Sequence, residues 1–420
     1  MPRRYFGTDG VRGVVGEDLT DALVERLGRA FALWAEAGSV LLGRDTRGSG
    51  VPLEEALVRG LAGGGSAVIR GGVLPTPAVA LLAGDDCGAV ISASHNPPQY
   101  NGVKFFAGGG RKLSDEEEEA VESLLGTLAT DGGQILRGED LARRYVDLVC
   151  ERFGRPLDGL RVMLDCANGA TYEVGPEVLR RLGAHVATIG NEPDGTNINV
   201  GCGATDLGLL QQAVHGGEYD LGVAFDGDGD RMLAVDAAGN EVDGDQIVAI
   251  LALHLRVDLV AVTQMTNLGF HRLMEDHGIR VITTDVGDRY VLEALRREGG
   301  LLGGEQSGHL VYLDGHRTGD GLVGAVLLCR ALVESGKTLA ELAAQMPKYP
   351  QAKTSVPVRS KEISPELRHE IEELANSGRV VVRPSGTEPV VRVLAEAESE
   401  KEAADLCGRI AALVSRELGS

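Results

Sequence analysis

The sequence predicts an α/β protein composed of several similar units, and three observations support this fold class. Short apolar runs typical of buried strands alternate with stretches of helical spacing almost throughout the chain. The alternation starts again near residues 151 and 249, so that each block has the size of a small α/β domain. Glycine is abundant, at 59 of 420 residues, and aromatic residues make up only 4%, as expected of a fold with many strand-to-loop turns.

The first block contains strands and helices in alternation, which predicts a mixed or parallel sheet with helices on its faces. Strands are expected at Val40 to Gly43, Ala67 to Ile69 and Gly88 to Ile91. Helical spacing covers Asp18 to Ala37 and Pro52 to Ala62.

The next two blocks repeat this pattern. Strands are expected at Leu160 to Leu164 and Leu221 to Phe225 in the second block, and at Leu259 to Val262 and Val281 to Thr283 in the third. A last short strand at Leu301 and Leu302 leads into a glycine-rich loop. We therefore expect three similar α/β domains with weak self-similarity in sequence.

The C-terminal part differs from the three blocks. Pro347 to Val358 contains proline and lysine and is interpreted as a linker. Beyond it we expect helices at Pro365 to Asn376 and Ser399 to Leu418, with strands around Arg379 to Pro384 and Val390 to Ala395 between them. This is the pattern of a small α+β domain. The predicted domains are 1–150, 151–248, 249–352 and 353–420.

The composition argues against two classes of partner. With 62 acidic and 41 basic residues the net charge is -21, so we expect no nucleic acid and no anionic membrane as a main partner. No apolar run approaches membrane length, and the N-terminus lacks an apolar signal segment. Six cysteines are scattered without a CxxC pair, as in reduced proteins. These features predict a cytoplasmic enzyme.

A loop of sequence DGDGDR, at residues 226 to 231, is the strongest chemical signal in the chain. Its carboxylates, on Asp226, Asp228 and Asp230, are separated only by glycines, which let the backbone fold them round one ion. Hard divalent cations prefer such oxygen ligands. The adjacent Arg231 indicates that an anion, most simply a phosphate, lies beside the metal.

Two other interpretations of this loop fit less well. A solvated acidic turn would crowd three like charges together with nothing to offset them. An EF-hand calcium loop needs glycine at its sixth position and glutamate at its twelfth, but counting from Asp226 these are Arg231 and Ala237. The loop therefore predicts a catalytic or phosphate-linked metal site.

The segment ISASHNP, at residues 91 to 97, leaves a predicted strand and enters a polar loop. Ser94 is a candidate nucleophile because it follows a strand in an α/β domain, although Ser, Asn and Pro also build ordinary turns. The Gly-x-Ser-x-Gly frame of serine hydrolases is absent. A serine nucleophile beside a metal loop fits phosphoryl transfer better than acyl transfer.

Three basic residues elsewhere are candidate partners of a phosphate. Lys104 follows the serine loop closely, and it could stabilise phosphate charge or move a proton. Arg12, in GTDGVRG, and Arg289, in GDR, are candidate anion contacts. Each could instead be a surface or ion-pair residue, which is the commoner fate of a lone lysine or arginine.

Two further loops carry polar groups. In GGEQSGH, at residues 303 to 309, Glu305 and Ser307 could hydrogen-bond to two neighbouring sugar hydroxyls. His309, in the same segment, could be a general acid or base, or merely a polar loop residue. RPSGTEP, at residues 383 to 389, lies between two strands and resembles a phosphate nest, with an ordinary hairpin turn as the alternative. Its candidate phosphate ligands, with one arginine from the next strand, are Arg383, Ser385, Gly386, Thr387 and Arg392.

Together these segments resemble the α-D-phosphohexomutases. The resemblance runs from TDGVRG at residues 8 to 13 to RPSGTEP at 383 to 389, with the four loops in the family's order. GEQSGH, RYFGTDG and the NIN of residues 197 to 199 are similar to the subgroup that acts on glucosamine phosphates. Members that act on glucose or mannose phosphates more often have Met at the position of Gln306.

The resemblance implies three related α/β/α domains and a smaller C-terminal domain around one central cleft. It implies that Ser94 carries a phosphoryl group and, with Asp226, Asp228 and Asp230, holds Mg2+. It further implies interconversion of glucosamine 6-phosphate and glucosamine 1-phosphate through a glucosamine 1,6-bisphosphate intermediate. The first phosphoryl group on Ser94 would come from self-phosphorylation, a kinase or a bisphosphate, and a homodimer is an open possibility.

The resemblance also implies a role for each remaining candidate. Lys104 and His309 would manage protons, and Arg12 and Arg231 would contact the reacting phosphate. Glu305 and Ser307 would bind the sugar, Arg289 would bind the substrate, and the RPSGTEP loop would hold the phosphate that does not react. The alternatives are a phosphoglucomutase or phosphomannomutase, a metal-dependent sugar phosphatase, and a catalytically silent sugar-phosphate-binding protein.

Overall fold

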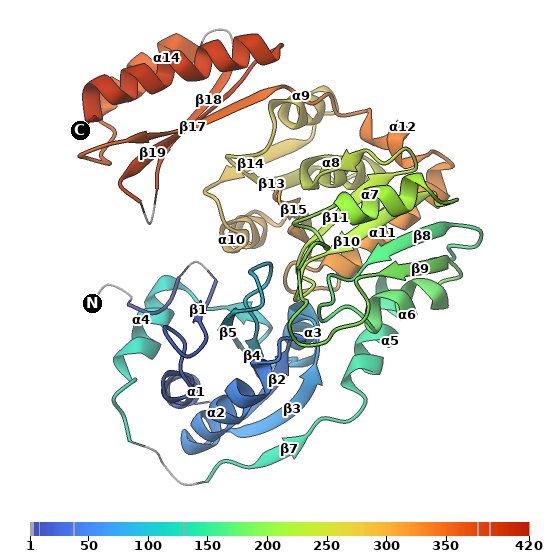
Figure 1. Ribbon diagram of the computed structural model, residues 1–420, viewed down its shortest axis with the longest axis vertical. Helices are drawn as coiled ribbons and strands as arrows, with labels where there is room; N and C mark the ends of the chain where they lie inside the picture. Colours follow the sequence, from blue (N-terminus) through green and yellow to red (C-terminus); the bar gives the residue numbers. More distant parts are fainter. Residues whose placement is uncertain are drawn as a thin grey trace.

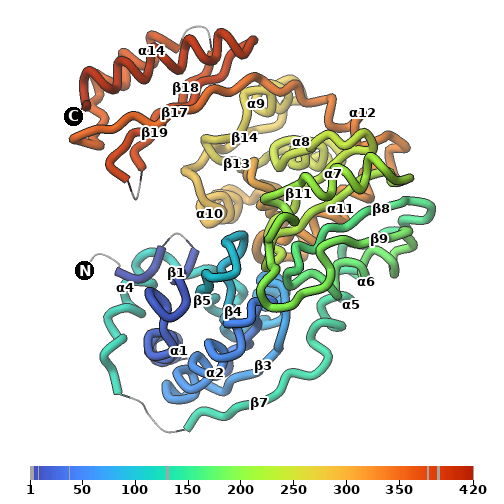
Figure 2. Tube along the Cα trace, viewed as in Figure 1, coloured from blue at the N-terminus to red at the C-terminus, as the bar shows by residue number. Residues whose placement is uncertain are grey.

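The computed structural model describes most of the chain. The described residues are 4–7, 9–36, 38–128, 132–375, 378–385 and 388–419. Their strands form four sheets in sequence order, each with helices packed against it, which we call the first, second, third and C-terminal units (Figure 1). The units follow one another in an arc, with the first and the C-terminal units at its two ends (Figures 1 and 2). The predicted architecture of three α/β/α units and a smaller α+β unit is confirmed.

The first unit has a seven-stranded mixed sheet in the order β1-β5-β4-β2-β3-β7, with β6 paired to β5. Its strands are β1 (Val11–Val14), β2 (Ser39–Arg44), β3 (Ala67–Val73), β4 (Cys87–Ile91), β5 (Tyr100–Ala107), β6 (Arg111–Lys112) and β7 (Ile135–Arg137). Its helices are α1 (Asp21–Ala35), α2 (Gly50–Gly63), α3 (Thr76–Leu82) and α4 (Asp115–Ser123). Because β4 and β5 are antiparallel, with Val90 opposite Lys104, the chain that leaves β4 through the serine loop returns directly beside it.

The second and third units repeat this arrangement in smaller sheets. The second sheet has the order β12-β11-β10-β8-β9 and the third β14-β13-β15-β16. Their strands are β8 (Arg161–Asp165), β9 (His185–Ile189), β10 (Leu221–Phe225), β11 (Met232–Asp236), β12 (Glu241–Val242), β13 (Leu259–Thr263), β14 (Arg280–Thr284), β15 (Leu302–Gly304) and β16 (Leu310–Tyr312). The helix α5 (Leu141–Phe153) precedes the second sheet in the chain. The helices that follow in the two units are α6 (Val174–Arg181), α7 (Gly208–His215), α8 (Gly244–Leu255), α9 (Leu268–Asp276), α10 (Asp288–Glu298), α11 (Gly321–Ser335) and α12 (Leu339–Ala343).

The C-terminal unit corrects one expectation. We expected a linker at Pro347 to Val358, but most of this segment is β17 (Gln351–Pro357), which pairs along its whole length with β19 (Val390–Glu396). The strand lies at the edge of the sheet β17-β19-β18 and is largely exposed, so its side chains are polar and its sequence lacks an apolar run. The other elements match the prediction, although Asn376 lies outside the described residues. They are α13 (Pro365–Leu374), β18 (Arg379–Pro384) and α14 (Glu400–Leu418).

All four functional loops occupy the same place in their sheets. The serine loop joins β4 to β5, the DGDGDR loop joins β10 to β11, the GGEQSGH segment joins β15 to β16, and the RPSGTEP segment joins β18 to β19. Each pair of strands is antiparallel. In the first three units the strand before the loop also pairs with a parallel neighbour. The loops therefore leave the carboxyl ends of these strands, where open α/β sheets bind ligands.

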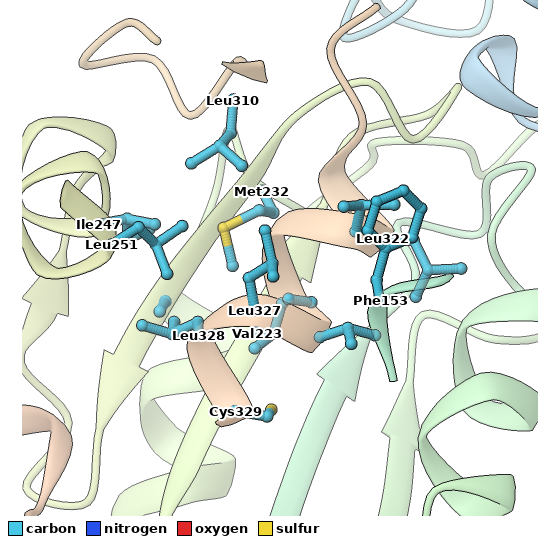
Figure 3. Packing of buried hydrophobic residues seen from close by; sticks show 14 of the residues in the cluster. Phe153, Val223, Met232, Ile247, Leu251, Leu310, Leu322, Leu327, Leu328 and Cys329 are labelled. Carbon is cyan, nitrogen blue, oxygen red and sulfur yellow. The ribbon is translucent and has the colours of Figure 1, made fainter. Parts of the chain in front are cut away.

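Helix α11 lies in the core that the second and third units share. Its sequence is apolar nearly all round, as expected of a helix that is covered on every side. Its leucines pack among side chains of α5, α8, β11 and β16, which are Phe153, Met232, Ile247, Leu251 and Leu310 (Figure 3). This common core holds the DGDGDR and GGEQSGH loops in one relative position.

The C-terminal unit has a core of its own and joins the third unit through polar contacts. Arg379 donates to the carbonyl of Thr266 at 2.8 Å and pairs with the buried Glu396, 2.6 Å away. Glu396 also accepts from the N–H of Leu268 at 3.2 Å. These contacts lie at the N-terminus of α9, whose N-cap is Asn267.

Asp245, at the start of α8, makes stability depend on pH. It is 1% exposed and accepts from the N–H of Asn267, and burial raises its pKa to about 7. The folded protein therefore keeps this proton up to about pH 7, whereas the unfolded chain releases it near its ordinary pKa of 3.8. The stability that this group supplies is complete below pH 4 and is lost as the pH rises through 7.

We predict that Asp245→Asn, which cannot ionise, gains stability relative to the wild type as the pH rises from 4 to 8. The gain is at most about 4 kcal/mol, since one pKa unit corresponds to about 1.4 kcal/mol. Urea unfolding of both proteins at several pH values measures it. A difference that does not change with pH would contradict the buried titration.

Candidate active site

Ser94 lies at the centre of the site with a strained backbone. Its φ is +51°, in the left-handed region that serine rarely adopts. Its N–H donates to the hydroxyl of Ser92 at 2.9 Å, which in turn donates to Asp45 at 2.6 Å. The Ser94 hydroxyl, 1% exposed, donates to Asp226 Oδ2 at 2.5 Å. The structure thus brings the predicted nucleophile onto the predicted metal loop, 132 residues further along the chain.

The DGDGDR loop buries its three carboxylates together. Asp226 and Asp228 are 0% and Asp230 is 4% exposed, and one oxygen from each lies within 4.8 Å of the others. Burial, and then the charges of Asp230 and Asp228, raise the pKa of Asp226 well above its usual value. The Oδ1 atoms of Asp228 and Asp230 are buried without a hydrogen-bond partner among the described residues. A cluster of hard oxygens with free lone pairs fits a divalent cation.

Lys104 supplies the nearest positive charge. Its ammonium lies 2.8 Å from Asp228 Oδ2, 3.2 Å from Asp230 Oδ2 and 2.8 Å from Asp9 Oδ2. Burial by itself would lower the pKa of Lys104, but these three carboxylates outweigh it and hold the pKa well above its usual value. Lys104 is therefore charged over the whole physiological range.

Arg12 reaches this network through Asp9. Arg12 Nη2 lies 2.5 Å from Asp9 Oδ2, and Lys112 lies 2.8 Å from Asp9 Oδ1. Lys112 also pairs with Asp288 at the start of α10, which joins the first unit to the third. Asp9, Lys112 and Asp288 were not among the sequence-predicted residues. No motif in the sequence includes Lys112, and nothing local singled out Asp288.

His309 and Arg231 connect the second and third loops. The two residues form an isolated antiparallel bridge through their backbones. His309 Nε2 lies 3.0 Å from Asp288 Oδ2, and its Nδ1 lies 3.7 Å from Asp230 Oδ1. Burial would lower the pKa of His309, but Asp288 and Asp230 raise it to about 10. The Arg231 guanidinium, 25% exposed, lies 3.8 Å from Asp230, so part of it remains open to solvent.

The expected sugar-binding pair lies next to this network. Glu305 is 9% exposed and accepts from the N–H of Gly287 at 3.1 Å, and burial raises its pKa. Ser307 is exposed. Gln306 instead lines a separate cavity of about 520 Å³ with Lys348 and Tyr349, between the third and C-terminal units.

The C-terminal arginines line another cavity. Arg383 and Arg392 lie opposite each other on β18 and β19, and both line a cavity of about 450 Å³ that also contacts Met265. None of its described lining residues comes from the serine or DGDGDR loops. Ser385 is buried, and its hydroxyl accepts from the N–H of Glu388 at 3.3 Å. The other two predicted ligands in this loop, Gly386 and Thr387, lie outside the described residues.

Arg289 departs from its predicted role. We expected it to bind substrate, but it is 8% exposed and its guanidinium is engaged by the first unit. It donates to the carbonyl of Leu113 at 3.1 Å and to the carboxylate of Asp115. Arg289 therefore joins α10 to the start of α4. A lone arginine after glycine and aspartate has the same local sequence whether it meets a ligand or a carboxylate.

Comparison with known proteins assigns the family. Sequence models of phosphoglucomutase/phosphomannomutase match all along the chain: α/β/α domain I at residues 3–130, domain II at 143–239, domain III at 243–349 and the C-terminal domain at 328–413. The chain belongs to the α-D-phosphohexomutase family. It is therefore a mutase, an enzyme of the isomerase class.

The relatives of this hexomutase extend over its whole length. A protein of Pelotomaculum thermopropionicum named phosphoglucosamine mutase is 48% identical over 97% of this chain and 98% of its own. One of the same name from Thermobifida fusca is 47% identical over 99% of both chains.

Two solved structures have the same fold. A phosphoglucomutase/phosphomannomutase family protein of Burkholderia thailandensis superposes with a TM-score of 0.85 at 23% identity, covering 98% of this chain and 97% of its own. N-acetylphosphoglucosamine mutase of Aspergillus fumigatus, in complex with GlcNAc-6P and magnesium, gives 0.75 at 19% identity, covering 100% and 96%. Within the described part of the hexomutase, no helix is both long and apolar enough to span a membrane.

We predict that Lys104→Met strongly destabilises the hexomutase in the absence of metal. Removing one partner of a buried ion pair leaves uncompensated charge and typically costs about 3–5 kcal/mol. The matched control is Lys348→Met: Lys348 lies 2.8 Å from the buried Asp243 but is 41% exposed. The control should lose no more than about 1 kcal/mol, as is usual for exposed pairs. Urea unfolding measures both, and equal losses would contradict the role of Lys104 in balancing the carboxylates.

Proposed function

We propose that this hexomutase interconverts glucosamine 6-phosphate and glucosamine 1-phosphate by phosphoryl transfer to and from Ser94. The observation that carries the proposal is the Ser94 hydroxyl, held 2.5 Å from Asp226 in a cluster of three buried carboxylates. Near-full-length relatives named phosphoglucosamine mutase support the choice of the amino sugar.

Asp226, Asp228 and Asp230 are the residues that would hold Mg2+, with an oxygen of the phosphorylated Ser94 as a further ligand. The unpartnered Oδ1 atoms of Asp228 and Asp230 and the mutual repulsion of the three carboxylates fit a hard cation. When bound, Mg2+ neutralises charge on the phosphoryl group as it is transferred.

The reaction consists of two phosphoryl transfers, one from Ser94 to the sugar and one from the other end of the sugar back to Ser94. In the first transfer the bond between phosphorus and Ser94 Oγ breaks, a bond from phosphorus to the O1 of glucosamine 6-phosphate forms, and the O1 proton leaves. The product is glucosamine 1,6-bisphosphate. After this intermediate turns over, Ser94 Oγ takes the phosphoryl group from O6, which regains a proton.

Charged residues around Ser94 assist both transfers. Lys104 and Arg12 meet at Asp9, so that their positive charges lie beside the DGDGDR loop. Arg231 keeps part of its guanidinium exposed for a phosphate oxygen. The surrounding carboxylates raise the pKa of Lys104 and of His309, so both side chains place positive charge beside the reacting groups. Both lie next to the DGDGDR carboxylates, where they are placed to exchange protons with the attacking and leaving oxygens.

The phosphate that does not react is held by the C-terminal unit. Arg383 and Arg392 line one cavity, and the buried Ser385 follows two residues after Arg383. Gly386 and Thr387, the next two residues of the sequence, are the further proposed ligands. Because the intermediate binds in two orientations, this site must accept either phosphate. Glu305 and Ser307 are suited to bind sugar hydroxyls, which are common to both orientations.

The test of the substrate is kcat/KM for glucosamine 6-phosphate against glucose 6-phosphate and mannose 6-phosphate, with Mg2+ and a catalytic amount of 1,6-bisphosphate. We expect a preference for the amino sugar of at least about 10-fold, the size of discrimination that a single contact supplies. A preference for glucose or mannose phosphate would contradict the proposed amino-sugar substrate. It would be compatible with the proposed phosphoryl transfer at Ser94. Release of inorganic phosphate in place of the isomer would instead identify a phosphatase.

Ser94→Ala should lower turnover by at least about 10⁴-fold, because a covalent mechanism cannot proceed without its nucleophile. Binding of glucosamine 6-phosphate, measured by isothermal titration calorimetry, should persist. Substantial mutase activity in this variant would exclude the phosphoserine.

Asp228→Asn should reduce the rise in Tm that Mg2+ produces in the wild type, since a ligand that binds only the folded state stabilises it in proportion to its affinity. The matched control is Asp236→Asn, which changes a buried aspartate that accepts from its own turn after β11. The control should have a lower Tm and an unchanged response to Mg2+. An equal response in both variants would count against the metal site.

A further inference from the structure

We propose that Asn199 of the second unit is a positioning residue for Ser94 of the first unit. This inference rests on the proposed function, because it names what holds the nucleophile of that reaction in place. Asn199 ends the NIN segment of residues 197 to 199, which lies outside the four functional loops. The segment follows β9 and belongs to the second unit.

The serine loop needs external support because its backbone is strained. Ser94 has a φ of +51° without being glycine, and a residue in this region persists only where its surroundings hold it. The backbone carbonyls of Ser94 and Asn96 both accept hydrogen bonds from side chains elsewhere in the chain. Arg47, 1% exposed, donates through Nη2 to the Ser94 carbonyl at 3.0 Å and to the Asn96 carbonyl at 2.8 Å.

Asn199, in the second unit, donates hydrogen bonds to the same two carbonyls as Arg47. Its Nδ2 donates to the Ser94 carbonyl at 2.9 Å and to the Asn96 carbonyl at 3.1 Å. The orientation of the amide follows from these partners, since its oxygen in the same place would face two carbonyl oxygens. The two carbonyls are therefore held by one donor from each unit.

The backbone of Asn199 is itself anchored in the second unit. Its N–H donates to the carbonyl of Ala167 at 2.9 Å, its φ is +59°, and the preceding Ile198 is buried. Asparagine tolerates this left-handed conformation better than most residues. Asn199 thus presents its amide from a defined position.

Glycine at position 227 allows a close approach between the two units. A Cβ atom there would lie 2.6 Å from the Ser94 carbonyl oxygen and 2.9 Å from Asn199 Nδ2. The carbonyl of Ser94 therefore packs against both Asn199 and the DGDGDR loop. Since Asp226 and Asn199 belong to the same unit, the amide sets the position of the Ser94 hydroxyl relative to the carboxylates.

The test is Asn199→Asp, with Asn197→Asp as the matched control. Aspartate has the size and the left-handed tolerance of asparagine but cannot donate to the two carbonyls. Asn197 lies two residues away, and its side-chain hydrogen bonds to described residues stay in its own loop: it donates to the Glu192 carbonyl at 2.9 Å and accepts from the N–H of Asp194 at 3.0 Å.

The first readout is the rate constant for transfer from phosphorylated Ser94 to glucosamine 6-phosphate, measured by rapid quench at saturating sugar phosphate. A first-order rate constant does not depend on the fraction of inactive protein, so a loss of folded enzyme alone leaves it unchanged. We expect Asn199→Asp to lower it by about 10- to 100-fold, as small displacements of reacting groups do, with the KM nearly unchanged. Asn197→Asp should match the wild type.

The second readout is hydrogen exchange of a peptide covering residues 92 to 97, which does not require turnover. We expect faster exchange in Asn199→Asp and wild-type exchange in Asn197→Asp. A wild-type transfer rate in Asn199→Asp overturns the inference. If the wild type itself transfers no phosphoryl group, the proposed function fails, and exchange alone then decides whether Asn199 holds the serine loop.

Discussion

The burial of three carboxylates within 4.8 Å of one another is the constraint on which the rest of the site depends. Like charges at this distance, taken out of water, repel strongly unless cations are brought to them. The fold brings Lys104 from β5, Arg231 from the same loop and His309 from the third unit. Their pairing still leaves carboxylate oxygens without hydrogen-bond partners among the described residues, which is the arrangement that a divalent cation completes.

A single topological device places the four functional loops. In each unit a loop connects a strand to its antiparallel neighbour. The loop therefore lies at the carboxyl end of the first strand, and the chain returns beside that strand. The core around α11 fixes the second and third loops relative to each other. The C-terminal unit, with its separate core, is attached mainly by polar contacts around Arg379 and Glu396. It is thus the part of the molecule best suited to move relative to the other units.

Residues whose chemistry is contained in a short segment could be predicted from the sequence. The alternation of aspartate and glycine after an apolar run indicated a cation loop without any distant partner, and Ser94 follows a strand that is recognisable by itself. Residues that act through distant partners could not. Lys112 and Asp288 are 176 residues apart, and no local pattern at either position indicates the other. Arg289 was predicted to bind substrate for the same reason. No residue near it in the sequence indicates its partners at the start of α4.

The sequence by itself determined the class of the fold, the positions of about half of the strands and a few of the helices, and the residues of the serine and DGDGDR loops. These are properties of periodicity and of residue type within a few positions. Only the tertiary structure decided which charges are balanced, that β17 is a strand, and that Asn199 and Arg47 share the carbonyls of the serine loop. Those outcomes depend on distances between segments far apart in the chain, and distance in space is set by packing of the whole molecule.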